Sequence, residues 1–295
     1  MTLLRTAAPA KINLYLHITG RRADGYHLLD SLVVFANVGD VLTLEPAGAF
    51  DFVLDGPKAP SLAGQDKESN LAVRAARMLA VTLGKPLEVK LTLTKNLPVA
   101  SGIGGGSTDA AAALRLLAMH WGLAPDAALL QEIAADLGQD VPCCLAAQSC
   151  YFKGIGDVTD LAPELPLTHM VLVNPNKALA TPAVFKARSG PFLPPARLER
   201  EPADAAQLAA MLASRGNSLT EAAIGLCPEI QAILESLTAQ PECLLARMSG
   251  SGATCFGLFA DRMTAKQAAS TLYREHPDWW VIPAYFPVDD PTRAR

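Results

Sequence analysis

The chain has 295 residues, of which 50% are hydrophobic and 18% are charged, and its formal net charge at pH 7 is −4. This composition is typical of a folded globular protein with one large or two ordinary domains, and it excludes a disordered chain. The negative balance excludes a general electrostatic attraction to nucleic acid or to an anionic membrane, so a nucleotide would have to be held by local donors.

No apolar run reaches the roughly 18 residues of a membrane span, and the N-terminal residues lack the apolar core of a signal peptide. The six cysteines show no C-x-x-C spacing. We therefore expect neither a zinc site nor a disulfide framework, and we expect a reducing cytoplasm as the location.

Periodicity and turn residues predict the elements in chain order. In the first half, strands are predicted at 10–18, 31–35, 41–44, 51–54, 87–94 and 150–153, and helices at 69–83, 107–121 and 126–137. A proline-rich exposed connection is predicted at 192–202 and is followed by two helices, strands at 244–248 and 254–259, a helix at 264–274 and a strand at 281–286. A domain boundary near residue 160 divides the chain into 1–160 and 161–295.

The stretch from Pro98 to Thr108 is the most informative part of the chain. It holds four glycines within five residues, between a predicted strand and a predicted helix. Glycines let successive backbone N–H groups turn toward one point, and a helix N-terminus adds unpaired N–H groups, so the pattern favours a phosphate loop. An ordinary helix capped by Ser107 or Thr108 is the alternative. No lysine follows the glycines, which excludes the G-x-x-x-x-G-K-[ST] loop.

A second glycine cluster runs from Ser249 to Ala253 between two predicted strands. Alone it predicts a hairpin turn. Beside the first loop it could instead donate backbone N–H groups to the same polyphosphate or to a substrate.

Two charged residues are candidates for chemistry. Lys11 shares one face of its strand with Asn13 and Tyr15, and a face this polar could line a cleft, although a surface lysine is the alternative. Asp140 follows a predicted helix end and is either a turn aspartate or a carboxylate that takes a proton from an attacking hydroxyl, held by a cation such as Lys11.

Tyr26 and His27 follow an Asp-Gly turn signal. A tyrosine ring offers a stacking face and a histidine offers a donor and an acceptor, which together suit a planar base. Two amphipathic residues that cover the edge of the core are the alternative.

Three segments together resemble the motifs of the GHMP kinase superfamily. They are the strand Pro9–Leu14, the loop Pro98–Ser107 and the turn Gly250–Ala253, in the superfamily's order. The segments 25–27, 140–142 and 181–185 are similar to one branch of it, which phosphorylates a cytidine diphosphate conjugate of methylerythritol in the non-mevalonate pathway to isopentenyl diphosphate. The resemblance extends from about residue 5 to 288.

The resemblance implies an α+β, two-domain GHMP kinase fold. Its N-terminal ATP domain would be like domain 2 of ribosomal protein S5, its C-terminal domain would be a ferredoxin-like α/β sandwich, and the active site would lie in the cleft between them. The implied reaction is ATP-dependent phosphorylation of the 2-hydroxyl of the methylerythritol unit, which gives the 2-phosphate and ADP, with Mg²⁺ carried by the nucleotide.

Two other functions remain open at this stage. One is another small-molecule GHMP kinase, acting on homoserine, mevalonate or a sugar, and the other is a non-catalytic nucleotide-binding protein of the same fold. In each case we expect a monomer or a weak homodimer, with no nucleic-acid or membrane partner.

The resemblance also implies roles for individual residues, with Lys11 and Asp140 as the catalytic pair and no protein metal ligand. It implies an ATP site, with Asn70 near the adenine, that comprises Asn70, Lys95, Pro98, Val99, Ala100, Ser101, Gly102, Ile103, Gly104, Gly105, Gly106, Ser107 and Thr108. In the implied substrate site Tyr26 and Phe185 enclose the cytosine, His27 binds its edge and Asn13 lies near the diphosphate. That site comprises Asn13, Tyr26, His27, Thr181, Phe185, Gly250, Ser251 and Gly252.

Overall fold

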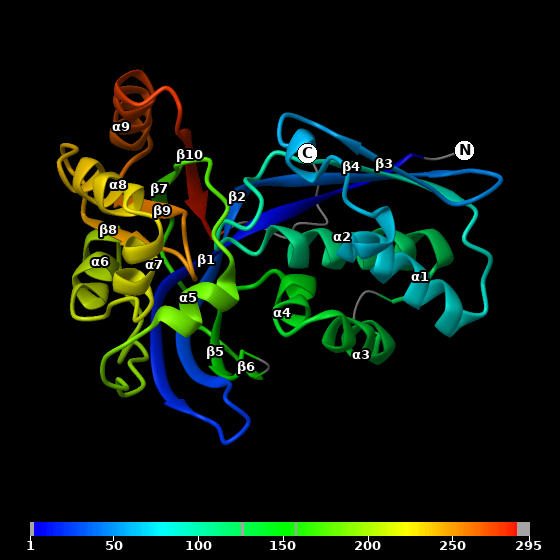
Figure 1. Cartoon of the computed structure of the whole chain (residues 1–295), viewed down its shortest axis with the longest axis horizontal. Coiled ribbons are helices and arrows are strands. Elements are labelled where there is room, and N and C mark those ends of the chain that lie inside the picture. Colours follow the sequence, from blue (N-terminus) through cyan, green and yellow to red (C-terminus); the bar gives the residue numbers. More distant parts are fainter. Residues whose placement is uncertain (1–2, 125–126, 157, 288–295) are drawn as a thin grey trace.

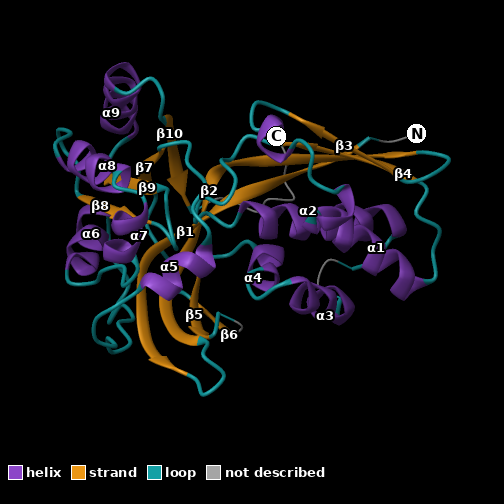
Figure 2. Ribbon diagram, viewed as in Figure 1, coloured by secondary structure: helices purple, strands orange, loops and turns teal. Residues whose placement is uncertain are grey.

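The computed structural model describes residues 3–124, 127–156 and 158–287, and these build two β-sheets that each carry a layer of helices (Figures 1 and 2). In Figure 1 the second sheet and its helices lie at the left, the helices of the first sheet lie at the right, and the first sheet runs from the right of the view to the bottom centre. The chain passes from the first sheet to the second between residues 161 and 168. The boundary near residue 160 stays a prediction.

The first sheet has the strand order β3-β4-β2-β5-β6, with β1 paired to β2. Two long antiparallel strands dominate it, and all neighbours are antiparallel except β3 and β4. Its strands are β1 (Leu4–Arg21), β2 (His27–Pro46), β3 (Asp51–Asp55), β4 (Val89–Thr94), β5 (Cys150–Gly154) and β6 (Val158–Leu161).

The strands predicted at 31–35 and 41–44 are one continuous strand, β2, so the turn expected between them is wrong. Gly39 lies inside β2 because the backbone of β1 approaches it too closely for a side chain. A Cβ at this glycine would lie 2.2 Å from the carbonyl oxygen of Ala8. The glycine therefore serves strand pairing and not chain reversal.

Four helices cover one face of the first sheet (Figure 2). They are α1 (Leu71–Leu83), α2 (Gly105–Trp121), α3 (Ala128–Leu137) and α4 (Val141–Ala146). Asn70 caps α1 as expected, and α2 is buried along most of its length. Asp126, where the third helix was predicted to begin, lies outside the described residues. The short helix α4 was not predicted, since a single apolar turn carries no helical periodicity.

The second sheet is antiparallel, with the order β10-β7-β9-β8. Three helices precede β8 where two were predicted, and β7 and α5 were not predicted. The elements of this half are β7 (Thr168–Asn174), α5 (Thr181–Ala187), α6 (Ala205–Ala213), α7 (Thr220–Leu226), α8 (Glu229–Thr238), β8 (Leu245–Met248), β9 (Cys255–Phe259), α9 (Arg262–Glu275) and β10 (Trp280–Phe286). Two 3₁₀ turns, Ala59–Leu62 and Lys67–Ser69, precede α1.

The two sheets pack on each other through alternating side chains of the second sheet. In β7, Met170 and Leu172 face Ile12 and Leu14 of β1 in a shared core. The intervening valines of β7 face the layer of α7, α8 and α9. Strand β1 therefore belongs to both halves, so residues on it can serve a site between them. No helix in the described part of the chain is long and apolar enough to cross a bilayer.

Candidate active site

A cavity of about 1300 Å³ lies between the two halves of the molecule. Its wall combines β1, the glycine loop before α2, the start of α4, helix α5 and the turn between β8 and β9. The predicted site residues that line it are Lys11, Asn13, Tyr26, His27, Asn70, Lys95, Pro98, Val99, Ala100, Ser101, Gly102, Gly104, Gly105, Gly106, Ser107, Asp140, Thr181, Phe185, Gly250 and Ser251.

Three predicted site residues do not line this cavity. Ile103 is fully buried in the core between the sheets, and Thr108 is fully buried one turn into α2. Gly252 packs against Met248, whose sulfur would lie 2.8 Å from an added Cβ. These three residues pack on the side of the loops that faces away from the cavity. Residues that face the cavity alternate along the chain with residues that face the core.

Lys11 and Asp140 form an ion pair across a sequence separation of 129 residues, with 2.7 Å between Nζ and Oδ2. Strand β1 presents the lysine, and Asp140 immediately precedes α4. The lysine side chain is 7% exposed and the aspartate side chain is 36% exposed. The carboxylate can therefore meet a substrate while the ammonium holds it from behind.

The surroundings keep Lys11 charged. Burial opposes its ionisation, but the Asp140 carboxylate, together with Cys143 and Cys144, outweighs burial and raises the pKa of the ammonium. The ammonium also lies 4.9 Å from the centroid of the Phe152 ring, where the negative face of the ring favours a cation.

The glycine loop fits closely against β1 and leads directly into α2. Gly104 has a φ of 66° and is the N-cap of α2, without a side-chain cap. The interpretation as an ordinary helix capped by Ser107 or Thr108 is therefore wrong. A Cβ on Gly104 would lie 3.0 Å from Cβ and 3.2 Å from Cε of Lys11. The glycine lets the lysine side chain lie along the loop, at the helix N-terminus where an anion is favoured.

The two glycine clusters lie back to back. A Cβ on Gly102 would meet the backbone nitrogen of Gly252 at 2.6 Å, and a Cβ on Gly250 would meet the carbonyl oxygen of Gly102 at 2.5 Å. The Ser249 hydroxyl donates to the Gly102 carbonyl at 3.1 Å. Only residues without a side chain allow this approach, which brings both loops to one cavity.

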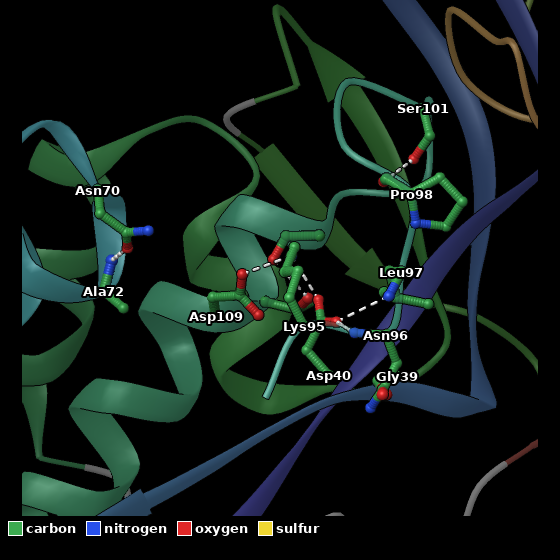
Figure 3. A network of polar contacts seen from close by, with 12 residues as sticks. Gly39, Asp40, Asn70, Ala72, Lys95, Asn96, Leu97, Pro98, Ser101 and Asp109 are labelled. Atoms are coloured by element: carbon green, nitrogen blue, oxygen red, sulfur yellow. Dashed lines mark hydrogen bonds and ion pairs between the residues drawn. The ribbon is translucent and has the colours of Figure 1, made fainter. Parts of the chain in front are cut away.

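Lys95 lies beneath the glycine loop and is bound by two carboxylates (Figure 3). Its Nζ is 2.5 Å from Oδ2 of Asp40 and 2.7 Å from Oδ2 of Asp109. Burial opposes the ionisation of Lys95, but these two carboxylates raise the pKa of its ammonium. The lysine contributes to the wall of the cavity, yet its donors are directed into this cluster.

Asn13 and Tyr15 do not share a face of β1, contrary to prediction. The pairing of β1 with β2 shifts between these two residues, so that Leu14 and Tyr15 both face the core between the sheets. The Tyr15 hydroxyl donates to Asp30 at 2.8 Å. Asn13 faces the cavity instead, and its buried Oδ1 has no hydrogen-bond partner among the described residues.

His27 and Phe185 pack together, with ring centroids 5.4 Å apart and an interplanar angle of 34°. Tyr26 lines the same cavity and is 57% exposed. Burial, followed by the positive charges of Arg188 and Arg21, lowers the pKa of His27. The imidazole therefore remains neutral at pH 7 and keeps both a donor and an acceptor.

Sequence reasoning missed several residues that line the cavity, among them Arg21, Arg188 and Phe152. Arg188 comes three residues after Phe185, one turn along the chain, so its spacing could have identified it. Phe152 sits in a predicted strand far from Lys11 in sequence, and no local signal points to their contact.

In the described residues no group of three or more His, Cys, Asp or Glu side chains could hold a metal ion. The wall of the cavity offers backbone N–H groups and cations, which are donors for anions.

Comparison with known proteins agrees with this geometry. The family models for the GHMP kinases N terminal domain and GHMP kinases C terminal match residues 70–148 and 198–278. A curated relative from Paramagnetospirillum magneticum, named 4-diphosphocytidyl-2-C-methyl-D-erythritol kinase, is 50% identical over 284 residues that cover 96% of this chain and 99% of the relative. A relative of the same name from Cereibacter sphaeroides is 52% identical over 94% of this chain and 97% of the relative.

A solved structure supports the fold prediction as well. The crystal structure of 4-(cytidine 5'-diphospho)-2C-methyl-D-erythritol kinase is similar with a TM-score of 0.77 and 32% identity, covering 96% of this chain and all of the other. The predicted α+β fold of two GHMP kinase domains is confirmed. The chain belongs to the GHMP kinases and, within them, to the family of the 4-diphosphocytidyl-2-C-methyl-D-erythritol kinases.

Proposed function

We propose that this protein transfers the γ-phosphoryl group of ATP to the 2-hydroxyl of 4-diphosphocytidyl-2-C-methyl-D-erythritol, in the methylerythritol phosphate pathway to isopentenyl diphosphate. The Lys11–Asp140 pair beside the glycine loop is the observation that carries the proposal. Membership of the family that bears this name supports it.

ATP binds with its phosphates at the glycine loop and the N-terminus of α2. Backbone N–H groups from Gly104 to Ser107 and the partial positive charge of the helix end compensate the phosphate charge. Mg²⁺ carried by the nucleotide would supply further positive charge when bound. Asn70, whose carboxamide oxygen caps α1 at 2.9 Å from the nitrogen of Ala72, lies in the same wall and is placed near the adenine.

Asp140 orients the acceptor hydroxyl and accepts its proton while the bond from the hydroxyl oxygen to the γ-phosphorus forms. The bond from that phosphorus to the bridging oxygen breaks, and ADP leaves. Phosphoryl transfer passes through a loose transition state, so position and charge stabilisation matter more than a strong base. Lys11 contacts both the loop and Asp140 and stabilises the charge that develops between them.

The cytidine end of the substrate lies against His27, Phe185 and Tyr26. The two aromatic rings offer stacking surfaces, and neutral His27 offers hydrogen bonds to the cytosine edge. Asn13 lines the cavity at the middle of the proposed substrate site. Homoserine and mevalonate have no base, so this end of the cavity favours the cytidine conjugate over them.

The six cysteines are all free, which supports the reducing cytoplasm as the location. A monomer or weak homodimer remains our proposal for the assembly.

A substrate screen tests the function. ADP release is followed with purified protein, ATP and Mg²⁺, and with the cytidine conjugate, homoserine or mevalonate as the acceptor. We expect turnover with the cytidine conjugate alone. Faster release with homoserine or mevalonate would overturn the substrate assignment, and no release with any acceptor would contradict a phosphotransferase.

A further inference from the structure

Lys95, Asp40 and Asp109 form a buried cluster beneath the glycine loop whose formal charges do not cancel. All three side chains are at most 4% exposed. With both carboxylates ionised, one ammonium and two carboxylates would leave one net negative charge. An added Cβ on Gly105, the first residue of α2, would lie 3.1 Å from Lys95 Nζ and 3.7 Å from Asp40 Oδ2. That charge would therefore sit directly against the loop that receives the phosphates, where it repels them.

One proton on the cluster removes this repulsion, and the hydrogen bonds indicate which carboxyl holds it. Oδ1 of Asp40 accepts from the backbone nitrogens of Asn96 at 2.6 Å and Leu97 at 2.8 Å, and its Oδ2 accepts from Lys95 (Figure 3). Three donors stabilise the ionised form of Asp40.

Asp109 has a much poorer set of partners. Its Oδ2 accepts from Lys95, and its buried Oδ1 has no hydrogen-bond partner among the described residues. A buried carboxylate oxygen without a donor costs far more as part of a charged group than as part of a neutral carboxyl. We propose that Asp109 is a positioning residue that carries a proton on its carboxyl group when ATP binds, so that the cluster beneath the glycine loop is neutral and the loop can hold the phosphates.

The electrostatic surroundings of Asp109 agree with this assignment. Burial, partly offset by Lys95 and reinforced by Asp40, raises the pKa of Asp109 to about 8. Among the other elements packed on α2, β1 contributes Lys11, whose ammonium is paired with Asp140. Helices α1 and α3 direct their charged side chains, such as Arg77 and Asp136, toward solvent. The cluster therefore loses its proton above neutral pH, and nucleotide affinity should fall as it does.

The inference rests on the proposed ATP site, and direct binding measurements test it without the acceptor substrate. The affinity for a non-hydrolysable ATP analogue, at a fixed excess of Mg²⁺, is measured by calorimetry from pH 7 to pH 9.5. Phosphates have lost their last proton well below pH 8, so the ligand keeps its charge over the upper part of this range. We expect the affinity of the unsubstituted protein to fall by roughly tenfold, since loss of one proton changes it by at most tenfold per pH unit.

Asp109→Asn is the decisive variant, because the amide has the shape of a protonated carboxyl and cannot lose a proton in this range. We expect its affinity to stay within about twofold across the series. Asp136→Asn, an exposed carboxylate on α3, is the matched control and should retain the pH dependence of the unsubstituted protein. Equal pH dependence in Asp109→Asn and the unsubstituted protein would overturn the inference.

Infrared spectroscopy of the unsubstituted protein provides a second measurement that does not depend on the folding of a variant. We expect the carbonyl band of a protonated carboxyl at pH 7 and its loss by pH 9.5. Absence of this band at pH 7, or a pH-independent affinity, would overturn the inference. No nucleotide binding at any pH would instead contradict the proposed ATP site, so the two failures can be distinguished.

Discussion

Two lysines lie on either side of the glycine loop, and their carboxylate partners differ in access to the cavity. Lys11 holds one aspartate, Asp140, whose side chain is 36% exposed. Lys95 holds two aspartates, and neither is more than 4% exposed. Both lysines pair with aspartate side chains, so the chemistry of the two contacts is the same. The accessibility of the carboxyl group therefore distinguishes one that can receive a substrate proton from those that shape the loop. Stability should depend on the Lys95 cluster, and turnover should depend on the Lys11–Asp140 pair.

The largest effect is expected from Lys95→Met. Removal of the ammonium leaves the buried Asp40 carboxylate without its cation and the buried Asp109 carboxyl without its donor, which costs about 3–5 kcal/mol of the free energy of unfolding. Urea denaturation measures this loss. The control is Lys90→Met on β4, the strand that ends just before Lys95, where a half-exposed pair with Glu45 at 3.7 Å should contribute less than about 1 kcal/mol. Similar losses in the two variants would contradict a structural role for Lys95.

The next effect concerns Asp140→Asn. The amide cannot accept the proton of the acceptor hydroxyl, so we expect turnover to fall by roughly 10²-fold or more while ATP and substrate affinities change little. Steady-state kinetics and calorimetry measure the two separately. Asp136→Asn serves as the control for loss of a nearby exposed carboxylate. Near-normal turnover would remove Asp140 from the catalytic pair.

A smaller effect is expected at the cytidine end of the cavity. Phe185→Ala should weaken binding of the cytidine substrate by about 1–3 kcal/mol if the ring stacks on the base. Calorimetry should show no change in ATP affinity. Tyr273→Ala, an exposed aromatic residue on α9, is the control. Unchanged affinity for the cytidine substrate would exclude Phe185 from the base site.

The smallest effect concerns the ionisation of His27. Burial and then the positive charges of Arg188 and Arg21 lower its pKa, so protonation is pushed to more acidic pH. Arg188→Gln removes one of these charges and should raise the pKa of His27, which an NMR titration of the imidazole measures. Arg200→Gln, an exposed arginine away from the cavity wall, should leave the titration unchanged. A pKa that does not rise in Arg188→Gln would show that the charge of Arg188 does not contribute to lowering it.

Local sequence patterns predicted the parts of the site that need a particular backbone. The four glycines from Gly102 to Gly106 allow the turn, the close approach of Gly250 and the contact with Lys11. Asn70 was also predictable, because a residue that caps a helix has a local signature. The predicted orientation of Tyr15 was wrong because the pairing of β1 with β2 shifts before this residue. The shift depends on the partner strand, and the alternation of polar and apolar residues in β1 does not indicate it.

The sequence by itself determined β1, α1 and α2 beside the cavity and the family of the chain, and it predicted a phosphate loop at residues 98–108. These features depend on local backbone preferences and on the order of motifs along the chain, and both can be read from the sequence. The pairing of Lys11 with Asp140 was predicted, but tertiary structure alone decided which charges meet in the Lys95 cluster. Asp40, Lys95 and Asp109 come from β2, the end of β4 and α2, and the partners of a buried carboxylate determine whether it holds a proton. The positions of these residues along the chain do not indicate that they meet, so the role of Asp109 can be inferred only from the folded structure.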